Sequence, residues 1–569
     1  MNELPTSADV ETEIETPAPR RPGDFWFAYV VFIGFCIAAL LVLPAQASSL
    51  LLVAAIFLSI VFIARDAEVS FRQFISLPVQ VVRAVRSPDI ATLNQKELRT
   101  QAGAVAAIVS TIFMFWAAHL MRPNEKDELV NQGVVVLLIG GALLGITLWL
   151  YRYDQPGVTI SDQPLTPARS RPGITLFGLL MLLLLAEISG NLLGLKLATL
   201  IPHRIEFLLM IVGCGCIVWG LSGTTTLPKR FDLTIWRYLR HETVLSLLLI
   251  FVLALFLRTV NLNNTIRSSV DEVLVINSFN QAFTIKDAGL ATQVSHFHTT
   301  TQLYPFLQTE LVNLTGRTLG GFRLINALIG SLTVFAVYLL TEALFDRKTA
   351  LIAAFMLAVF PPHIHFSRIA MAHIADPIMG TLTFAFIARG LSDNRRLDWV
   401  LAGMALGFTQ YFFEGGRLLF PILTIGWIGL LLLIQRRQVL FLARGLMIML
   451  IVAFIVMMPV YYSILARNDT RTARLDASGV GTNFWSELAG NGISFEDLRV
   501  VGQRFLSPLL IYIHQLEIQY YYAGPTAIFL EAVAPLFFLT MFYLLWRWRR
   551  PEAFLAVWVI LAAVANGVV

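Results

Sequence analysis

Long apolar runs recur along nearly the whole 569-residue chain, and they restrict its fold more than any other feature. A helix that crosses a membrane needs about 20 consecutive apolar residues. Barrel strands are shorter and alternate in polarity, whereas these runs are continuous. With 57% hydrophobic residues, 14% charged residues and a mean hydropathy of +0.71, the chain is too apolar for a soluble globular protein. The sequence therefore predicts an all-α, polytopic helical membrane protein.

The apolar runs predict about 15 transmembrane helices, with boundaries that are the least certain part of the assignment. The predicted spans are residues 25–44, 49–64, 102–121, 132–151, 174–195, 205–222, 241–260, 321–340, 348–362, 376–391, 397–413, 417–435, 441–464, 525–546 and 552–569.

Clusters of Lys and Arg predict the orientation of these spans, because short cytoplasmic loops retain positive charge. With the N-terminus in the cytoplasm, one threading places every cluster on the cytoplasmic side. The clusters lie at residues 20–21, 65–99, 152–171, 229–240, 347–348, 395–396, 436–437 and 547–550. We therefore expect a multi-pass protein of the cell (inner or plasma) membrane.

Three regions are expected along the chain. Residues 1–23 are polar and contain Pro, Thr and Glu, which is typical of a disordered cytoplasmic tail. Residues 24–240 form an N-terminal membrane region of about six helices. Residues 241–569 form a second membrane module, because polar residues beside apolar spans become commoner there. The sequence ends within an apolar run, which leaves open whether this module is truncated at its C-terminus.

Charge and cysteine content exclude two classes of function. The net charge is only +5, and the basic residues are spread over short loops, so no nucleic-acid partner is expected. Cys36, Cys214 and Cys216 all fall within apolar runs, which indicates packing residues and neither disulfides nor a thiolate metal site. Membrane lipids are the partners that the composition itself predicts.

The first notable polar feature is Asp271-Glu272, which follows a span closely and lies in a long loop predicted to be outside. Adjacent residues do not share a face of a helix, so only one carboxylate would point into a given cavity. Asp is also a favoured residue for starting a helix. A helix cap and a catalytic carboxylate therefore both remain open for Asp271.

A second outward turn runs from Pro361 to Pro377 and contains His365, Arg368 and Asp376. A helix that begins after the prolines would carry these three residues near one stripe. Arg and Asp at the membrane border are costly unless they are paired or used. The alternatives are a functional site and a purely structural contact between Arg368 and Asp376.

A third outward turn contains Glu414 and Arg417, with Gly415 and Gly416 between them. The two glycines permit close approach of the backbone. A guanidinium is well shaped for gripping phosphate oxygens in a bidentate way. A local salt bridge between Glu414 and Arg417 is the competing interpretation.

The histidines of the second turn lack the spacing of a zinc site. A divalent cation is more plausible if Asp271 and Asp376 supply oxygen ligands, because a phosphate ligand would add further oxygens. No cofactor is firmly expected, and His365, Asp376 and Glu414 are the candidate supporting or metal residues.

From about residue 240 onward the sequence resembles the GT-C superfamily of membrane glycosyltransferases. The nearest resemblance is to glycosyltransferase family 39, including protein O-mannosyltransferases and lipid A aminoarabinose transferases. The residues that carry the resemblance are Asp271-Glu272, Tyr304-Pro305, Gly320 to Arg323, Ser367-Arg368 to Asp376-Pro377, and Tyr411 to Pro421.

The resemblance implies an inverting glycosyltransferase that moves a sugar from a polyprenyl-phosphate donor to a lipid, glycan or protein acceptor outside the cytoplasm. It implies that Asp271 is the general base, with Glu272 assisting it or bracing the loop. Arg368 and Arg417 would stabilise the departing phosphate, and Asp376 would orient Arg368 or hold a cation. The absence of a Gly-rich phosphate loop also argues against a nucleotide-sugar donor.

Two other functions remain open at this point. A transporter or flippase of a lipid-linked saccharide would use the same arginines to bind phosphate without breaking a bond. Transporters tend to show internal repeats and ionisable residues near the middle of the membrane, and neither is clear in this sequence. A non-catalytic membrane scaffold is the third possibility.

Overall fold

The structure is a computed structural model of the full chain. It describes residues 95–123, 125–151, 159–166, 171–223, 242–264, 272–273, 276–277, 288–294, 300–469, 508–515 and 527–568. The predicted tail at 1–23 and the predicted spans at 25–44 and 49–64 lie outside the described residues, as does Asp271.

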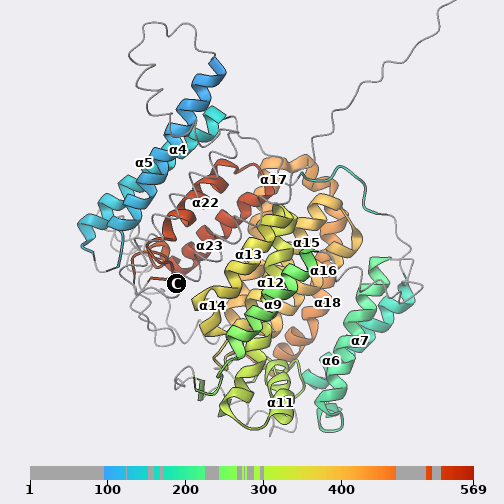
Figure 1. Ribbon diagram of the computed structural model, residues 1–569. Helices are drawn as coiled ribbons and strands as arrows, with labels where there is room; N and C mark the ends of the chain where they lie inside the picture. The colour runs from blue at the N-terminus through green and yellow to red at the C-terminus, as the bar shows by residue number, and fades with distance from the viewer. Residues whose placement is uncertain are drawn as a thin grey trace, which may run out of the picture.

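The described elements are α-helices and short 3-10 helices, arranged as Figure 1 shows. The α-helices are α4 (Gln95–Leu120), α5 (Asp127–Tyr151), α6 (Pro172–Gly190), α7 (His203–Ser222), α9 (Glu242–Thr259), α11 (Leu303–Thr315), α12 (Leu319–Leu344), α13 (Arg347–Val359), α14 (Pro361–Phe366), α15 (Ala375–Asp393), α16 (Arg396–Phe408), α17 (Glu414–Phe441), α18 (Ala443–Arg467), α22 (Ala534–Trp546) and α23 (Phe554–Val568). The 3-10 helices are η2 (Leu197–Thr199), η3 (Ala372–Ile374), η4 (Thr409–Tyr411) and η5 (Pro551–Ala553).

Among the described residues, eight helices are long and apolar enough to cross a membrane, and three shorter helices are also apolar. These helices coincide with predicted spans, and the described part of the chain contains no β-strand. The prediction of an all-α, polytopic membrane protein is therefore confirmed. The count of 15 spans stays a prediction.

The helix boundaries follow from local chemistry. Asp346 begins α13 by accepting hydrogen bonds from the backbone N–H groups of Lys348 and Thr349. Asn394 ends α15 in the left-handed conformation, with φ of 47°. Helix α17 is kinked at Gln435, where the predicted span ends and the basic pair at 436–437 follows.

The helices alternate in direction, so that the turns predicted to lie outside come together at the end of the bundle that carries α11 (Figure 1). Contacts establish this grouping. The side chain of Arg258 at the end of α9 contacts His363 in α14. The backbone N–H of Phe413, just before α17, contacts Asp376 in α15. We call this end of the bundle the α11 end.

The interior consists of several apolar clusters. One cluster joins α6 and α7 to residues 290–294 and 303–306, α16 and α18, with Leu185, Leu290 and Val452 fully buried. A second cluster joins α15, α17 and α23, where the ring of Trp427 stacks on Phe554 with 4.2 Å between centroids. Helices α6 and α7 therefore share a core with the later module. The domain boundary near residue 240 stays a prediction.

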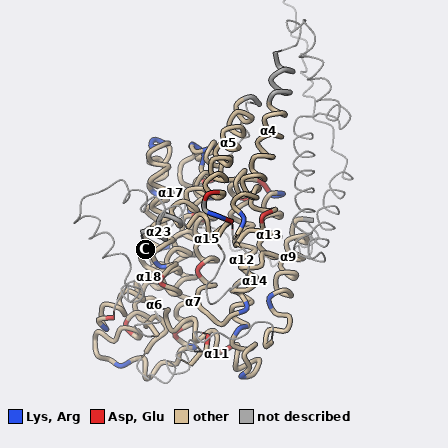
Figure 2. The backbone as a smooth tube through the Cα atoms, turned by 90° about the vertical axis from the view of Figure 1, so that its left-hand side faces the viewer, with Lys and Arg blue, Asp and Glu red and all other residues tan. Residues whose placement is uncertain are grey.

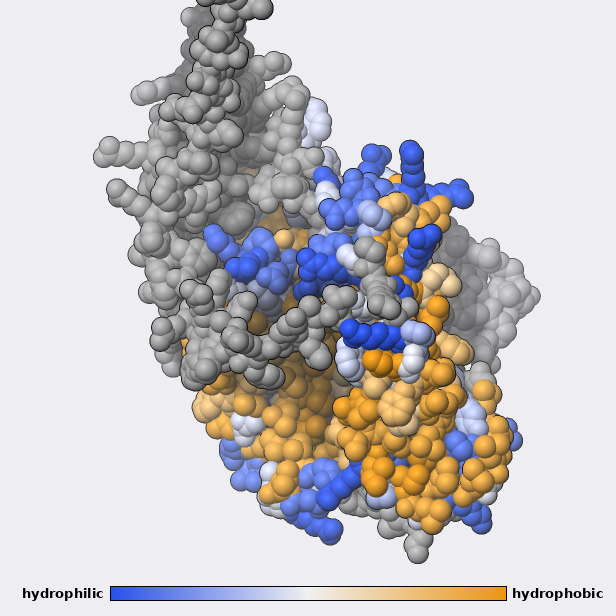
Figure 3. All heavy atoms as spheres, turned by 90° about the vertical axis from the view of Figure 1, so that its right-hand side faces the viewer, coloured by the Kyte–Doolittle hydropathy of each residue, from blue (hydrophilic) through white to orange (hydrophobic). Residues whose placement is uncertain are grey.

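The exposed side chains on the sides of the bundle are apolar, as expected for a protein embedded in lipid. Large apolar side chains of α6 and α7 are exposed, including Leu180 and Leu208. Figure 3 shows a broad apolar surface on the side of the molecule where α6 and α7 lie. Charged residues gather near the ends of the helices, and the long central stretches are largely uncharged (Figure 2). Such an apolar belt is what a bilayer requires of a helical membrane protein.

Candidate active site

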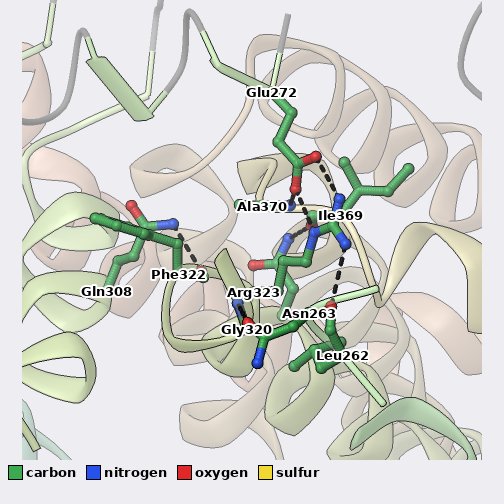
Figure 4. Close-up of polar contacts among 10 residues, drawn as sticks. Leu262, Asn263, Glu272, Gln308, Gly320, Phe322, Arg323, Ile369 and Ala370 are labelled. Carbon is green, nitrogen blue, oxygen red and sulfur yellow. Dashed lines mark hydrogen bonds and ion pairs between the residues drawn. The ribbon is translucent and has the colours of Figure 1, made fainter. Parts of the chain in front are cut away.

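The centre of the α11 end is a buried ion pair between Glu272 and Arg323 of α12 (Figure 4). The carboxylate accepts two hydrogen bonds from the guanidinium, at 2.7 Å from Nε and 2.6 Å from Nη2. Both side chains are 0% exposed. Bidentate pairing of this kind fixes both position and orientation.

Two backbone groups complete this ion pair. The N–H of Ala370 donates to Oε1 of Glu272 at 2.8 Å, and Nη1 of Arg323 donates to the carbonyl of Leu262 at 3.1 Å. The pair thereby ties Glu272, in the long loop after α9, to α12 and to the segment after α14. Glu272 follows Asp271 in the sequence, and Asp271 lies outside the described residues. The geometry of Glu272 suits a structural role, in which the carboxylate holds the loop in place through these hydrogen bonds, and we call this arrangement the Glu272 brace. A direct part for Glu272 in proton transfer stays a prediction.

Arg368 lies beside this pair, and its hydrogen-bond partners differ from Asp376, the partner considered from the sequence. Its Nη1 donates to the carbonyl of Leu257 at 2.6 Å, and its Nη2 donates to the carbonyl of Val260. These are carbonyls at the end of α9, where the last turn of a helix lacks partners of its own. Arg368 therefore caps α9, and its side chain is almost fully buried. Binding of phosphate by Arg368 stays a prediction.

Arg258 likewise donates to carbonyls at the end of a helix, in this case α13. From α9 it donates to the carbonyls of Leu357 and Ala358 at the end of α13, at 3.2 and 2.9 Å. Its Nη2 also contacts Nδ1 of His363 at 2.9 Å. Burial and the charge of Arg258 lower the pKa of His363 to about 3. His363 is therefore neutral near pH 7 and accepts the hydrogen bond.

His365 is half-buried next to Arg368. Burial lowers its pKa, the charges of Arg323 and Arg368 lower it further, and Glu272 opposes them. The three charged groups therefore lie within electrostatic reach of this imidazole, and their combined field is positive at His365.

The third turn forms a second polar cluster around Asp376, which is 7% exposed. Its Oδ1 accepts the N–H of Phe413 at 3.1 Å, and its Oδ2 accepts the N–H of Gly416 at 3.2 Å. Arg417 lies within electrostatic reach of both Asp376 and Glu414. The first turn of α17 is thus seated directly on Asp376.

The two glycines of this turn differ in what surrounds them. A Cβ at Gly416 would lie 2.6 Å from Oδ2 of Asp376, whereas a Cβ at Gly415 would lie 3.3 Å from Cδ1 of Phe413. The first distance forces Asp376 or the turn to shift, whereas the second requires the ring of Phe413 to give by only a few tenths of an ångström. We therefore expect Gly416→Ala to destabilise the protein by roughly 1–3 kcal/mol, the range for overpacking, and Gly415→Ala to have a small effect.

Thermal unfolding of the two purified variants in the same detergent tests this expectation. Equal melting temperatures for Gly416→Ala and Gly415→Ala would show that Asp376 is not held against this turn.

Asn326 of α12 joins the two polar clusters. Its side-chain amide donates to the carbonyls of Ile369 and Met371, with 2.7 Å to Met371, and its Oδ1 accepts from the hydroxyl of Tyr304. All four residues of this hydrogen-bond chain are buried. Asn326 therefore fixes the backbone between Arg368 and Asp376.

Formal charge distinguishes the two clusters. Glu272, Arg323 and Arg368 carry one negative and two positive charges, a net charge of +1. Asp376, Glu414 and Arg417 are two acidic residues and one basic residue, so the second cluster has no excess of positive charge. An anion is therefore attracted to the first cluster, and such effects are strong in a medium of low dielectric constant.

Neither cluster resembles a cation site. Within the described residues there is no group of three His, Cys, Asp or Glu side chains that could hold a metal. Asp376 faces two N–H groups and a guanidinium, which satisfy a carboxylate but oppose a bound cation. The candidate ligand Asp271 lies outside the described residues. The donor set that the structure describes does not fit the divalent cation considered above.

Sequence reasoning did not select Arg258, Arg323 and Asn326 as site residues. A usable signal was present, because Arg258 and Arg323 are charged residues within or beside apolar runs, and such residues face the interior of a membrane protein. No pattern in the sequence could have indicated that Arg368 would cap α9.

Comparison with protein families gives one result. Residues 300–462 match the family model of dolichyl-phosphate-mannose-protein mannosyltransferases. The matched segment runs from the residues before α11 into α18, and it includes Arg323, Arg368, Asp376 and Arg417. The predicted resemblance to membrane glycosyltransferases of the family-39 type is thereby confirmed over this segment. No curated protein and no solved structure matches the chain.

Proposed function

We propose that this protein is an inverting glycosyltransferase that moves a sugar from a polyprenyl-phosphate donor to an acceptor at the extracytoplasmic face of the cell membrane. The observation that carries the proposal is the buried, bidentate Glu272–Arg323 pair, in which Arg323 belongs to the segment that matches the mannosyltransferase family. It holds the residue next to Asp271 in a defined place, as a positioned general base requires.

Asp271 is the proposed general base. It removes a proton from the acceptor hydroxyl while that oxygen attacks the anomeric carbon from the side opposite the phosphate. The bond from the anomeric carbon to the phosphate oxygen breaks, and the electron pair leaves with the polyprenyl phosphate. The anomeric configuration is inverted by this single displacement.

The donor phosphate is proposed to bind beside Arg368 and His365. The net positive charge of the Glu272, Arg323 and Arg368 cluster stabilises the negative charge that develops on the leaving group. Arg368 can do so through its field while it remains on the carbonyls of α9. Arg417 is offset by Asp376 and Glu414, and its proposed role is to hold the turn before α17.

The proposed orientation rests on charge. The polar turns that contain Glu272, Arg368 and Asp376 gather at the α11 end. The basic pairs at 347–348, 395–396 and 436–437 adjoin the opposite helix ends. Since short cytoplasmic loops retain Lys and Arg, the α11 end is the extracytoplasmic one. Lipid, glycan and protein hydroxyls are the acceptor classes that this location offers.

The purified full-length protein, supplied with a radiolabelled polyprenyl-phosphate sugar and an acceptor extract, is expected to form a labelled glycosidic product. The same protein in sealed vesicles should show no translocation of the donor beyond that of empty vesicles. Translocation without a glycosidic product would overturn the proposal and favour a transporter of lipid-linked saccharides.

The same assay, carried out on variants of Arg368 and Arg417, tests where the donor phosphate binds. Arg368→Gln removes the positive charge beside His365 and should raise the KM for the donor about tenfold or more, because a charge close to a phosphate is worth at least about 1.4 kcal/mol in a site of low dielectric constant. Arg368→Lys keeps the charge and should recover part of this loss. Arg417→Lys is the matched control and should leave the donor KM within about twofold of the wild type. The opposite ranking would place the phosphate at Arg417.

A further inference from the structure

Helices α6 and α7 contribute buried polar side chains to the α11 end, although they precede the module that matches a family. Glu206, in the first turn of α7, is 0% exposed. Its Oε2 accepts the backbone N–H of Leu290 at 2.7 Å, and its Oε1 contacts Nδ1 of His203 at 2.9 Å. A buried carboxylate on an apolar helix is costly unless it is used.

Ser189, near the end of α6, contacts Ala291, the residue that follows Leu290. Its Oγ accepts the N–H of Ala291 at 3.1 Å. Its carbonyl accepts the hydroxyl of Thr292 at 2.9 Å and Nε of Arg467 at 2.7 Å. One residue of α6 is therefore bonded both to the segment 288–294 and to the end of α18.

The fit between these helices and the segment is close. A Cβ at Gly289 would lie 2.7 Å from Oγ of Ser189 and 2.9 Å from Oε2 of Glu206. Leu290 and Ala291 are fully buried, so their N–H groups would lack solvent if the side chains of α6 and α7 did not accept them. The positive end of the α7 dipole also favours a carboxylate in its first turn.

From this segment a path of hydrogen bonds, joined by neighbouring residues of the backbone, leads to Glu272. The N–H of Leu303 donates to the carbonyl of Leu290 at 3.1 Å, which places the start of α11. Tyr304 follows and donates to Asn326, whose amide holds the carbonyls on both sides of Ala370. The N–H of Ala370 donates to Glu272.

We propose that Glu206 and Ser189 are positioning residues that hold segment 288–294, and through it the Glu272 brace, in the geometry required for sugar transfer. Helices α6 and α7 are then required for full transferase activity. This inference rests on the proposed function, and it adds that the N-terminal region contributes directly to the site.

Hydrogen exchange of the full-length protein tests the structural half of the proposal. Glu206→Leu removes the acceptor of the Leu290 amide, and Ser189→Ala removes that of the Ala291 amide. Each should raise exchange in a peptide covering 288–294 by about tenfold or more, the scale of a lost buried hydrogen bond. Glu206→Gln retains an oxygen acceptor and should show a smaller rise.

A matched control is available between the same elements. Arg204 of α7 and Glu310 of α11 form an exposed pair with both nitrogen–oxygen distances at 3.0 Å. Exposed pairs contribute little, so Glu310→Gln should leave exchange at 288–294 unchanged. Unchanged exchange in Glu206→Leu and Ser189→Ala alike would overturn the proposal.

Transfer kinetics test the functional half. A displaced brace should lower kcat about tenfold or more while the donor KM changes little, because misplacement of reacting groups acts on the chemical step. Raised exchange with an unchanged kcat would overturn the positioning role. If the wild-type protein forms no glycosidic product, the proposed function fails instead, and the exchange measurement still reports whether α6 and α7 hold the segment.

Discussion

Asp271→Asn is expected to lower the rate of sugar transfer by about 10²- to 10⁴-fold, the usual contribution of a general base. The amide has nearly the same shape as the carboxylate but cannot take up the acceptor proton. Because Glu272 and Arg323 retain their ion pair, the variant should insert and accumulate as the wild type does. Steady-state kinetics and abundance in membranes measure the two effects separately.

Asp393→Asn is a suitable control for this experiment. Asp393 is partly exposed at the end of α15, far along that helix from Asp376, and it forms an ion pair with Arg395 on the surface. Its replacement should leave transfer unchanged. Full activity in Asp271→Asn would remove Asp271 as the base and would weaken the assignment of the whole site.

Breaking the Glu272–Arg323 pair is expected to have the largest effect on stability. Glu272→Leu leaves the guanidinium of Arg323 buried without its carboxylate, and Arg323→Met leaves the carboxylate without its guanidinium. Loss of one partner from a buried ion pair costs about 3–5 kcal/mol, because the remaining charge is uncompensated. Both single variants should therefore show strongly lowered melting temperatures.

The double variant Glu272→Leu/Arg323→Met separates stability from function. Replacing a buried ion pair with apolar groups of similar volume is often neutral, so the melting temperature should recover most of the loss. Transfer should remain low, because the segment that carries Asp271 is no longer oriented. A double variant that recovers both melting temperature and activity would show that the pair has no positioning role.

The apolar runs were enough to predict the long helices of the described chain, although α11 was not among the predicted spans. The predicted spans at 205–222 and 441–464 correspond closely to α7 and α18. The reason is that a bilayer demands apolar side chains residue by residue, so a local property of the sequence reports the element directly. The alternation of helix direction also follows, since each short turn reverses the chain.

The partners of the polar residues were decided only by the tertiary structure. Arg368 was weighed as a phosphate ligand or a partner of Asp376, yet its guanidinium caps the carbonyls of α9, more than 100 residues earlier. Glu272 and Arg323 are 51 residues apart, and Glu206 and Leu290 are 84 apart. No periodicity relates positions at such separations.

The sequence by itself therefore determined that this protein is an all-α membrane protein and which turns carry its charged residues. Only the tertiary structure decided that Arg323 braces Glu272 and that Asp376 holds the turn before α17. It also decided that α6 and α7 contact segment 288–294. Hydropathy is a property of each residue in its own segment, whereas a hydrogen bond depends on which distant segments packing brings within about 3 Å of each other.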